Sequence, residues 1–389
     1  MPPFASFSPF CSSPADNVLS ARIDTSSPLP HCNLFFASLL HVSEPPALTR
    51  LFNVPTRTAS GVINTANTTD PANGLVTESS NADDPLVGRY VARAGSGVGV
   101  SCDVGRIGVE GSLGDIAQII ACSVCFLSAL YLIYRSVRRR AAVGRAEMVH
   151  LFMVFAATLV VKIFTTGNVL KQGSAAISVL SALHVGLLAL SGWILLLNAA
   201  VAFQLLEDGS VSSLLILYAG GAVFFATTTY FALDQAFGIT SLFLLSRSSA
   251  AERDLGNVAL MLLGVLWPYL NNPSGPKGAE FGGRAVLVYF LVMGYVVYFH
   301  LRERKPLKWF TMAFLLFAGA QAVQFLASHP LCVVSNARLT AGFLNTLLET
   351  ASLWLLFVAW KSITEDDWYD DLGAGEQEEM KNWEGYGVY

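Results

Sequence analysis

The sequence predicts an all-α, polytopic membrane protein with seven transmembrane helices. Seven long apolar stretches lie between Leu113 and Trp360, 53% of the residues are hydrophobic and only 13% are charged. Soluble domains carry about 25% charged residues. A helix needs about 20 apolar residues to cross the hydrocarbon core of a bilayer. Because backbone polar groups in lipid must be paired within the protein, these stretches are expected to be helices.

The spans follow one another along the chain with short connections. We expect them at residues 113–134, 148–169, 181–205, 211–233, within 256–300, 308–328 and 340–361. The fifth is broken into apolar pieces of 15 and 16 residues, 256–270 and 285–300, each of which is short for a full crossing. Pro268 and Pro273 are consistent with an interrupted helix there. Whether this region crosses once or twice stays open, and one crossing is preferred.

The orientation follows from basic residues in short loops, which favour the cytosol. Segment 135–147 holds five arginines and segment 301–308 holds four basic residues, so both are expected to be cytosolic. The N-terminus is then lumenal and the C-terminus cytosolic. The chain accordingly divides into a Ser/Thr/Pro-rich, partly disordered lumenal tail (1–112), a seven-helix membrane domain (113–362) and an acidic cytosolic tail (363–389).

Six cysteines divide between the predicted compartments. Four fall on the lumenal side and are disulfide candidates: Cys11, Cys32, Cys102 and Cys332. An oxidising lumen favours two disulfides, but three pairings are possible and free thiols stay an alternative. Cys122 and Cys125 lie in the first span and are expected to be buried small hydrophobic residues.

One glycosylation sequon lies in the predicted lumenal tail. It is Asn67-Thr68-Thr69, which makes Asn67 a glycosylation candidate. A chance match to the triplet is the alternative interpretation.

Polar side chains within the predicted spans are candidate functional residues, because they are unfavourable in lipid. The candidates are Lys162, Gln321, Gln324 and Glu349. Lys162 and Glu349 could pair across the bundle. Alternatively, Lys162 reaches the lumenal interface, and Glu349 is protonated or hydrogen-bonded to Gln321, Gln324 or Asn345.

Small and amide residues could form a helix face that binds another membrane protein. The candidates are Gly220, Gly221, Ala318, Gly319, Gln321, Ala322 and Gln324. Packing within a single bundle is the alternative interpretation of the same residues.

No motif for catalysis or cofactor binding is found in the sequence. A Gly-rich phosphate loop, a His-Glu-x-x-His motif, paired Cys-x-x-Cys motifs and a Gly-x-Ser-x-Gly elbow are all absent. Processive sugar synthases also need a large soluble domain, and the segment after Trp360 has only 29 residues. We therefore expect no enzyme, no cofactor, no bound metal and no nucleic-acid partner.

The segment 361–389 is strongly acidic, with nine Asp and Glu residues against two Lys. A solvated end is one interpretation. The other is a docking strip for basic partner surfaces or vesicle-coat adaptors, which would suit export from the endoplasmic reticulum. The acidic residues of this candidate strip are Glu365, Asp366, Asp367, Asp370 and Asp371.

Several short strings occur in a characteristic order. They are 27–32 in the N-terminal tail, 139–147 with Gly144, Arg145 and Glu147, 206–210 with Glu207, Asp208 and Gly209, Trp267-Pro268, 348–351 and 360–368. Together they resemble the fungal chitin synthase export chaperone family in its basidiomycete-like form. The resemblance covers roughly residues 112–371 and the short N-terminal element.

The resemblance implies a multi-pass protein of the endoplasmic reticulum membrane, surrounded by membrane lipid. It would help a chitin synthase fold, assemble and reach the cell surface for cell-wall chitin synthesis. The family's lumenal cysteines match Cys11, Cys32, Cys102 and Cys332 by position. The chain departs from the pattern in its long tail 40–100, in the segment around Cys102 and in the insertion 271–283.

Two other function classes stay open on the sequence alone. A seven-helix receptor fits the helix count, although no ligand or coupling motif is recognised. A small-solute transporter would be expected to show an internal repeat or a cluster of intramembrane charges, and neither is found in the sequence.

Overall fold

In the residues that it describes, the structure, a computed structural model, is mainly helical and includes one very short β-pair. It describes residues 30–41, 56–57, 63–64, 115–139, 142–167, 169–170, 174–206, 210–240, 242–243, 257, 259, 284–301, 304–326, 331, 334–335 and 339–363. The β-pair joins β1 (Thr56–Arg57) and β2 (Ile63–Asn64) in antiparallel register.

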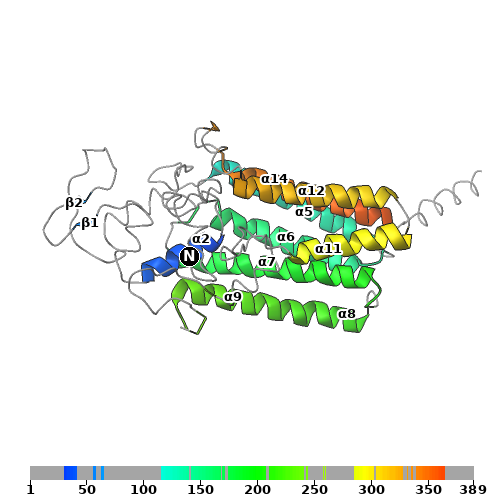
Figure 1. The fold of residues 1–389 in the computed structure, drawn as a ribbon, viewed down its shortest axis with the longest axis horizontal. Coiled ribbons are helices and arrows are strands. Elements are labelled where there is room, and N and C mark those ends of the chain that lie inside the picture. Colours follow the sequence, from blue (N-terminus) through cyan, green and yellow to red (C-terminus); the bar gives the residue numbers. More distant parts are fainter. Residues whose placement is uncertain are drawn as a thin grey trace, which may run out of the picture.

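The helices of the bundle run nearly parallel to one long axis (Figure 1). Five of them are single helices: α5 (Ile116–Arg138), α6 (Arg145–Thr165), α7 (Ala175–Ala202), α12 (Arg304–Leu326) and α14 (Ala341–Ile363). Between α7 and α12 lie two segments that each include a π-helix. The first is α8 (Val211–Leu215), η3 (Ile216–Gly220) and α9 (Gly221–Phe237), and the second is α11 (Arg284–Tyr295) and η4 (Val296–Leu301).

Six of these helical segments are long and apolar enough to cross a membrane. Among the described residues, the apolar helix Val286–Phe299 is shorter than these six. The prediction of an all-α membrane protein is therefore confirmed. The seventh crossing, expected within 256–300, stays a prediction.

Polar caps explain where several helices begin. Asp115 accepts a hydrogen bond from the backbone N–H of Gln118, and Ser174 accepts one from Ile177 in the same way. Such caps satisfy backbone donors that have no partner inside the helix. The third span was expected to start at residue 181, but α7 starts at Ala175, because the Ser174 cap extends the helix beyond its most apolar part.

Neighbours in sequence are also neighbours in space. α5 packs on α6, α6 on α7, and α7 on α9, while α12 and α14 form a closely packed pair. α14 also packs on α5, and α11 lies against α7 and α12. The five helices α6, α7, α11, α12 and α14 consequently surround the interior of the bundle.

Hydrogen bonds fix which helix ends lie together. The backbone N–H of Asp115 donates to the carbonyl of Gly167 over 2.9 Å, which joins the start of α5 to the end of α6. The hydroxyl of Thr340, just before α14, donates to Asp115 Oδ2 over 2.6 Å. At the opposite end, Trp360 Nε1 donates to the carbonyl of Val143 over 2.8 Å. The basic segment 135–147 therefore lies at the end of the bundle where α14 finishes.

Candidate functional site

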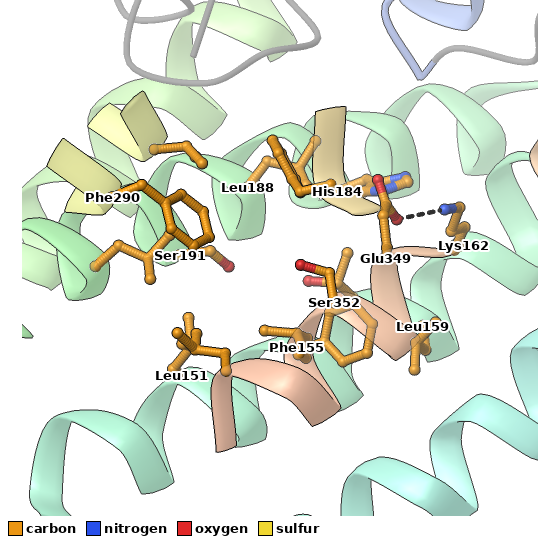
Figure 2. Close-up of a pocket in the computed structure, with 16 residues that line it drawn as sticks. Leu151, Phe155, Leu159, Lys162, His184, Leu188, Ser191, Phe290, Glu349 and Ser352 are labelled. Carbon is orange, nitrogen blue, oxygen red and sulfur yellow. Dashed lines mark hydrogen bonds and ion pairs between the residues drawn. The ribbon is translucent and has the colours of Figure 1, made fainter. Parts of the chain in front are cut away.

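An ion pair inside the bundle joins two helices far apart in sequence. Lys162 lies one turn before the end of α6, and Glu349 lies in the middle of α14. Lys162 Nζ and Glu349 Oε2 are 3.1 Å apart, and the two side chains are only 8% and 11% exposed. Figure 2 shows the pair at one end of a cavity. Of the two interpretations open for Lys162, the structure has the ion pair.

Amide side chains complete the surroundings of the carboxylate. Gln321 Nε2 on α12 donates to Glu349 Oε1 over 3.3 Å, and Asn345 Nδ2 on α14 donates to the same oxygen over 3.1 Å. Gln324 is buried one turn further along α12. A buried charge is tolerated only when it is paired and hydrogen-bonded. Glu349 on α14 meets this condition through Lys162 on α6 and Gln321 on α12, so it links the three helices.

A cavity of about 70 Å³ extends from the ion pair along the interior of the bundle. Figure 2 shows Lys162, Glu349 and His184 grouped at one end, with Leu151 and Phe290 away from them. Its walls are mainly leucine and phenylalanine side chains from α6, α7, α11, α12 and α14. The arrangement therefore combines an apolar slot with one polar end.

The short helix α2 (Pro30–His41) docks at the end of the bundle nearer the ion pair. It packs on α7 and α9. Asn33 Nδ2 donates to the carbonyl of Thr165 and to Ser181 Oγ, both over 3.0 Å. Thr165 Oγ1 lies 2.9 Å from Nδ1 of His184, which lines the cavity. A segment of the N-terminal tail is thus connected through hydrogen bonds to the cavity wall.

The docking of α2 was not predicted from the sequence. Its signals were present but weak: Pro30 begins the helix, a favourable position for proline, and apolar residues follow. Cys32 on this helix is disulfide-bonded. The other disulfide candidates, Cys11, Cys102 and Cys332, lie outside the described residues.

Burial changes the titration of two groups at this end of the bundle. Burial lowers the pKa of His31 on α2 from its ordinary value to about 3. Burial also raises the pKa of Asp115, although the hydrogen bonds from Thr340 and from backbone N–H groups oppose that change. Both groups therefore favour their neutral forms in the folded protein more than they would in water.

The opposite end of the bundle brings together residues from three of the strings described above. Gly144 has φ +71°, a left-handed conformation, and a Cβ atom there would lie 3.3 Å from Asn198 Nδ2 and 3.9 Å from Trp360 Nε1. The Ser213 hydroxyl, beside the helix cap at Ser210, donates to Glu147 Oε1 over 3.2 Å. Gly144 and Glu147 are thereby packed against α7, α8 and α14 near the ends of these helices.

Four of the seven residues predicted to form a partner-binding face pack inside the bundle instead. A Cβ atom on Gly220 would lie 2.4 Å from Trp193 Cζ2, and one on Gly221 would lie 2.9 Å from Leu190 Cδ1, so both glycines pack against α7 within the bundle. Gln321 and Gln324 are buried. The physical reason is that η3 and α9 need glycine where they approach Trp193 and Leu190, and that Gln321 donates to the buried Glu349 carboxylate.

The other members of that face point outward on α12. Ala318 is exposed, and Gly319 and Ala322 are partly exposed. Among the described residues, nothing lies within 4 Å of a Cβ atom added at Gly319. Met312 and Leu315 are also exposed and lie on the same side of the helix. This set, Met312, Leu315, Ala318, Gly319 and Ala322, is called the α12 stripe below.

Several candidate residues fall outside the described part of the chain. They are Asn67, Arg140, Glu207, Asp208, Gly209, Glu365, Asp366, Asp367, Asp370 and Asp371. Arg145 is described and is partly exposed at the first position of α6. In the first span, Cys122 and Cys125 are buried free thiols. Within the described residues, no group of three or more His, Cys, Asp or Glu could hold a metal ion.

Comparisons with known proteins agree on one family. A family model described as chitin synthase export chaperone matches residues 21–374. A relative of that name from Chaetomium globosum is 24% identical over 292 residues, covering 74% of this chain and 80% of its own. Relatives of the same name from Phaeosphaeria nodorum and Kluyveromyces lactis are 22% and 24% identical, covering 77% and 63% of this chain and 82% and 70% of their own. No solved structure matches the chain significantly. The chain, whose match extends from the docked α2 helix to the end of α14, therefore belongs to the chitin synthase export chaperone family.

Proposed function

We propose that this protein is a membrane chaperone that supports the folding and export of a chitin synthase to the cell surface, and thereby cell-wall chitin synthesis. The observation that carries the proposal is the family match over residues 21–374. The relatives reported above are named as export chaperones, not as receptors or transporters. Because the family is a chaperone family, an enzymatic activity is not part of the proposal.

The proposal includes seven crossings, with a lumenal N-terminus and a cytosolic C-terminus. The fifth crossing would be α11 (12 residues) together with η4 (6 residues). At 1.5 Å per residue this continuous segment is about 27 Å long, close to the roughly 30 Å of the hydrocarbon core. Counting it as one crossing keeps segments 135–147 and 301–308 on the same, cytosolic side.

We place the protein in the endoplasmic reticulum membrane, with 1–112 as the lumenal tail, 113–362 as the membrane domain and 363–389 as the acidic cytosolic tail. The disulfide at Cys32 supports a lumenal position for the first of these segments, because disulfides persist in oxidising compartments. Asn67 would then be available for glycosylation. The acidic residues from Glu365 to Asp371 would be available to vesicle-coat adaptors.

The α12 stripe is the face we assign to the client. A polytopic synthase exposes polar groups to lipid before its own helices are assembled, and each unpaired group is unfavourable there. Small residues such as Ala318, Gly319 and Ala322 let a second helix approach closely. Since a Cβ atom added at Gly319 would meet no described residue within 4 Å, the space beside it supports the approach of a partner helix.

The test is the location of a tagged chitin synthase in fungal cells that have or lack this gene. We expect the synthase to stay in the endoplasmic reticulum when the gene is deleted, while other membrane cargo reaches the surface. Normal delivery of every synthase in the deletion strain would contradict the proposal. A strain that expresses the full chain from a plasmid is the control, and it should restore delivery.

A further inference from the structure

Two arginines near the end of α5 lie over tyrosine rings on its outer side. The Arg135 Cζ atom is 5.9 Å from the ring centroid of Tyr131, and the Arg138 Cζ atom is 4.8 Å from that of Tyr134. Both distances are in the range of cation–π contacts. The spacing i, i+3, i+4 and i+7 puts the four residues on one face of the helix, and all four are exposed. They are called the Arg–Tyr face below.

The two arginines have hydrogen-bond donors and positive charge to offer. In the part of the chain that the structure describes, neither forms an ion pair with a carboxylate. A guanidinium that lies on a ring with its flat face keeps the N–H donors at its edge. Those donors match the oxygens of a phosphate group in geometry. The Arg–Tyr face is therefore suited to a phosphate-bearing ligand.

Contacts with α14 order one half of this face. The Tyr131 ring stacks on the Trp354 ring, with centroids 5.6 Å apart and an interplanar angle of 20°. Trp354 Nε1 donates in turn to Ser128 Oγ, one turn earlier on α5. Because the Tyr131 ring is held against α14, the Arg135 guanidinium lies on an ordered partner. That order reduces the side-chain entropy lost when an anion binds.

The same side of α5 is apolar one turn before the tyrosines. Leu127 is 65% exposed and Leu130 is 43% exposed, and they share the helix face of Tyr131 and Tyr134 by their spacing. The rise from Leu127 to Arg138 is about 16 Å, roughly half of a hydrocarbon core. Leucine, tyrosine and arginine thus follow one another over the depth of one leaflet, in the order of acyl chain, glycerol ester and phosphate in a phospholipid.

The length of α5 fits arginines at the level of the headgroups. The helix is long and apolar enough to cross a membrane, and its 19 residues from Ile116 to Tyr134 include no charged side chain. They extend over about 28 Å, close to the roughly 30 Å of the hydrocarbon core. Asp115 and Arg135 flank this stretch. A crossing therefore has little freedom of register, and it puts Arg135 and Arg138 at a polar boundary, where tyrosine is also enriched.

We propose that the Arg–Tyr face binds the phosphate of an anionic glycerophospholipid, with Arg135 and Arg138 donating to its oxygens and an acyl chain lying along Leu127 and Leu130. A net negative lipid is preferred because the two guanidinium charges are not neutralised by any described carboxylate. The site lies on α5, so it is separate from the α12 stripe. In the orientation proposed above, the lipid belongs to the cytosolic leaflet, where anionic lipids are concentrated.

The acidic segment 363–389 is a second anion to consider, because it follows directly on α14. The lipid is favoured because the arginines lie on the outer side of α5 and continue into exposed leucines. A charged chain segment over those leucines would be in hydrocarbon, which is unfavourable. A phospholipid uses both the arginines and the leucines.

The test is native mass spectrometry of the purified full chain in detergent, titrated with dioleoyl-phosphatidylserine or with dioleoyl-phosphatidylcholine. We expect the serine lipid to bind about tenfold more tightly. Arg135→Gln with Arg138→Gln should abolish that preference, and the variant should fold because both side chains are exposed. Arg135→Lys with Arg138→Lys should keep part of the preference, because lysine keeps the charge but lacks the planar set of donors.

The matched control is Lys308→Gln with Lys361→Gln. It removes two positive charges from exposed side chains on α12 and α14 and leaves the Arg–Tyr face intact. The preference for the serine lipid should be unchanged. Glycerophosphoserine, the same headgroup without acyl chains, should compete with the lipid at least about tenfold less well than the lipid itself, because it makes no apolar contact with the leucines.

Four results would overturn the proposal, and none depends on a chitin synthase. One is equal affinity of the wild-type protein for the two lipids. Another is equal loss of preference in the arginine variant and the lysine control, which would assign the attraction to net charge alone. Equal competition by glycerophosphoserine would make the ligand a soluble anion. Binding of the serine lipid only after Glu365→Gln, Asp366→Asn and Asp367→Asn would assign the Arg–Tyr face to the acidic tail.

Discussion

Lys162 and Glu349 are 187 residues apart in the sequence and form a hydrogen-bonded ion pair inside the bundle. The pair connects α6, which packs on α5 and α7, with α14, which packs on α12 and α5. Both side chains also line the cavity between these helices. The ion pair is consequently a direct polar link between α6 and α14 at one end of the cavity.

Removing one partner of this pair should destabilise the protein more than removing both. Lys162→Met leaves the buried Glu349 carboxylate without its cation, which typically costs about 3 kcal/mol or more. Lys162→Met combined with Glu349→Gln leaves an amide that can bond to Gln321 and Asn345, and should cost about 1 kcal/mol. Unfolding by SDS titration in mixed micelles measures both free energies.

The comparison of single and double variants is the control for lost packing. If the loss of unfolding free energy in the double variant equals the sum of the losses in the two single variants, the two side chains do not interact. The ion pair then contributes nothing to stability. A double variant closer to the wild-type protein than either single variant is the expected result.

The same glycine-to-alanine change should have opposite effects at two positions. Gly144 has φ +71° and lies close to Asn198, so Gly144→Ala should destabilise the folded state by about 1–2 kcal/mol. For Gly294, near the end of α11, no described residue lies within 4 Å of an added Cβ atom. Gly294→Ala should be neutral or stabilising by about 0.5–1 kcal/mol, because alanine favours helix.

The midpoint of thermal unfolding in detergent, measured on both variants and the wild-type protein, checks this pair of predictions. Equal shifts for the two variants would show that the left-handed backbone at Gly144 is not a constraint.

The membrane spans could be predicted from the sequence because bilayer thickness imposes a length on each apolar helix. The start of α7 at Ala175 was missed, since its cap at Ser174 is a polar signal that lies outside the apolar stretch. The alternating direction of neighbouring helices was expected from their short connections, while the cytosolic position of the basic segment 135–147 stays a prediction.

The contacts between helices could not be predicted in the same way. A glycine on an apolar helix has the same sequence signal whether it packs inward, as Gly220 does against Trp193, or outward, as Gly319 does. The pairing of Lys162 with Glu349 depends on the distance between two helices that no sequence spacing records. The docking of α2 likewise depends on buried partners for Asn33 that lie more than 100 residues away.

The α12 stripe gives a prediction for client binding. Gly319→Leu with Ala322→Leu should reduce co-purification of the chitin synthase about tenfold, because bulk prevents close helix approach. The protein should remain folded, since within the described part of the chain nothing lies within 4 Å of a Cβ atom added at Gly319. Co-purification from detergent-solubilised membranes, normalised to the amount of chaperone, is the measurement.

Gly294→Leu is the matched control, because a Cβ atom at Gly294 likewise meets no described residue within 4 Å, but Gly294 lies on α11. It should leave co-purification unchanged. If both variants lose the same amount of co-purified synthase, the cause is added bulk anywhere in the membrane domain. If the α12 variant loses none, the α12 stripe does not bind the client.

His31 on α2 makes the docking of that helix sensitive to acid. Its pKa is lowered by burial from 6.5 to about 3, so between these values the unfolded chain binds more protons than the folded protein. The stabilisation is complete above pH 6.5 and decreases as the pH falls towards 3, by about 1 kcal/mol for each pH unit.

The measurement is thermal unfolding of the wild-type protein and of His31→Gln at two pH values. One is neutral, and the other is about one unit below the ordinary histidine pKa of roughly 6.5. The difference between the two proteins isolates the contribution of His31. The variant should lose less stability on acidification than the wild-type protein, because glutamine takes up no proton. His150→Gln is the control, since His150 lies near the opposite end of the bundle and is partly exposed. Identical pH dependence in wild type and His31→Gln would show that α2 remains docked whether or not His31 is charged.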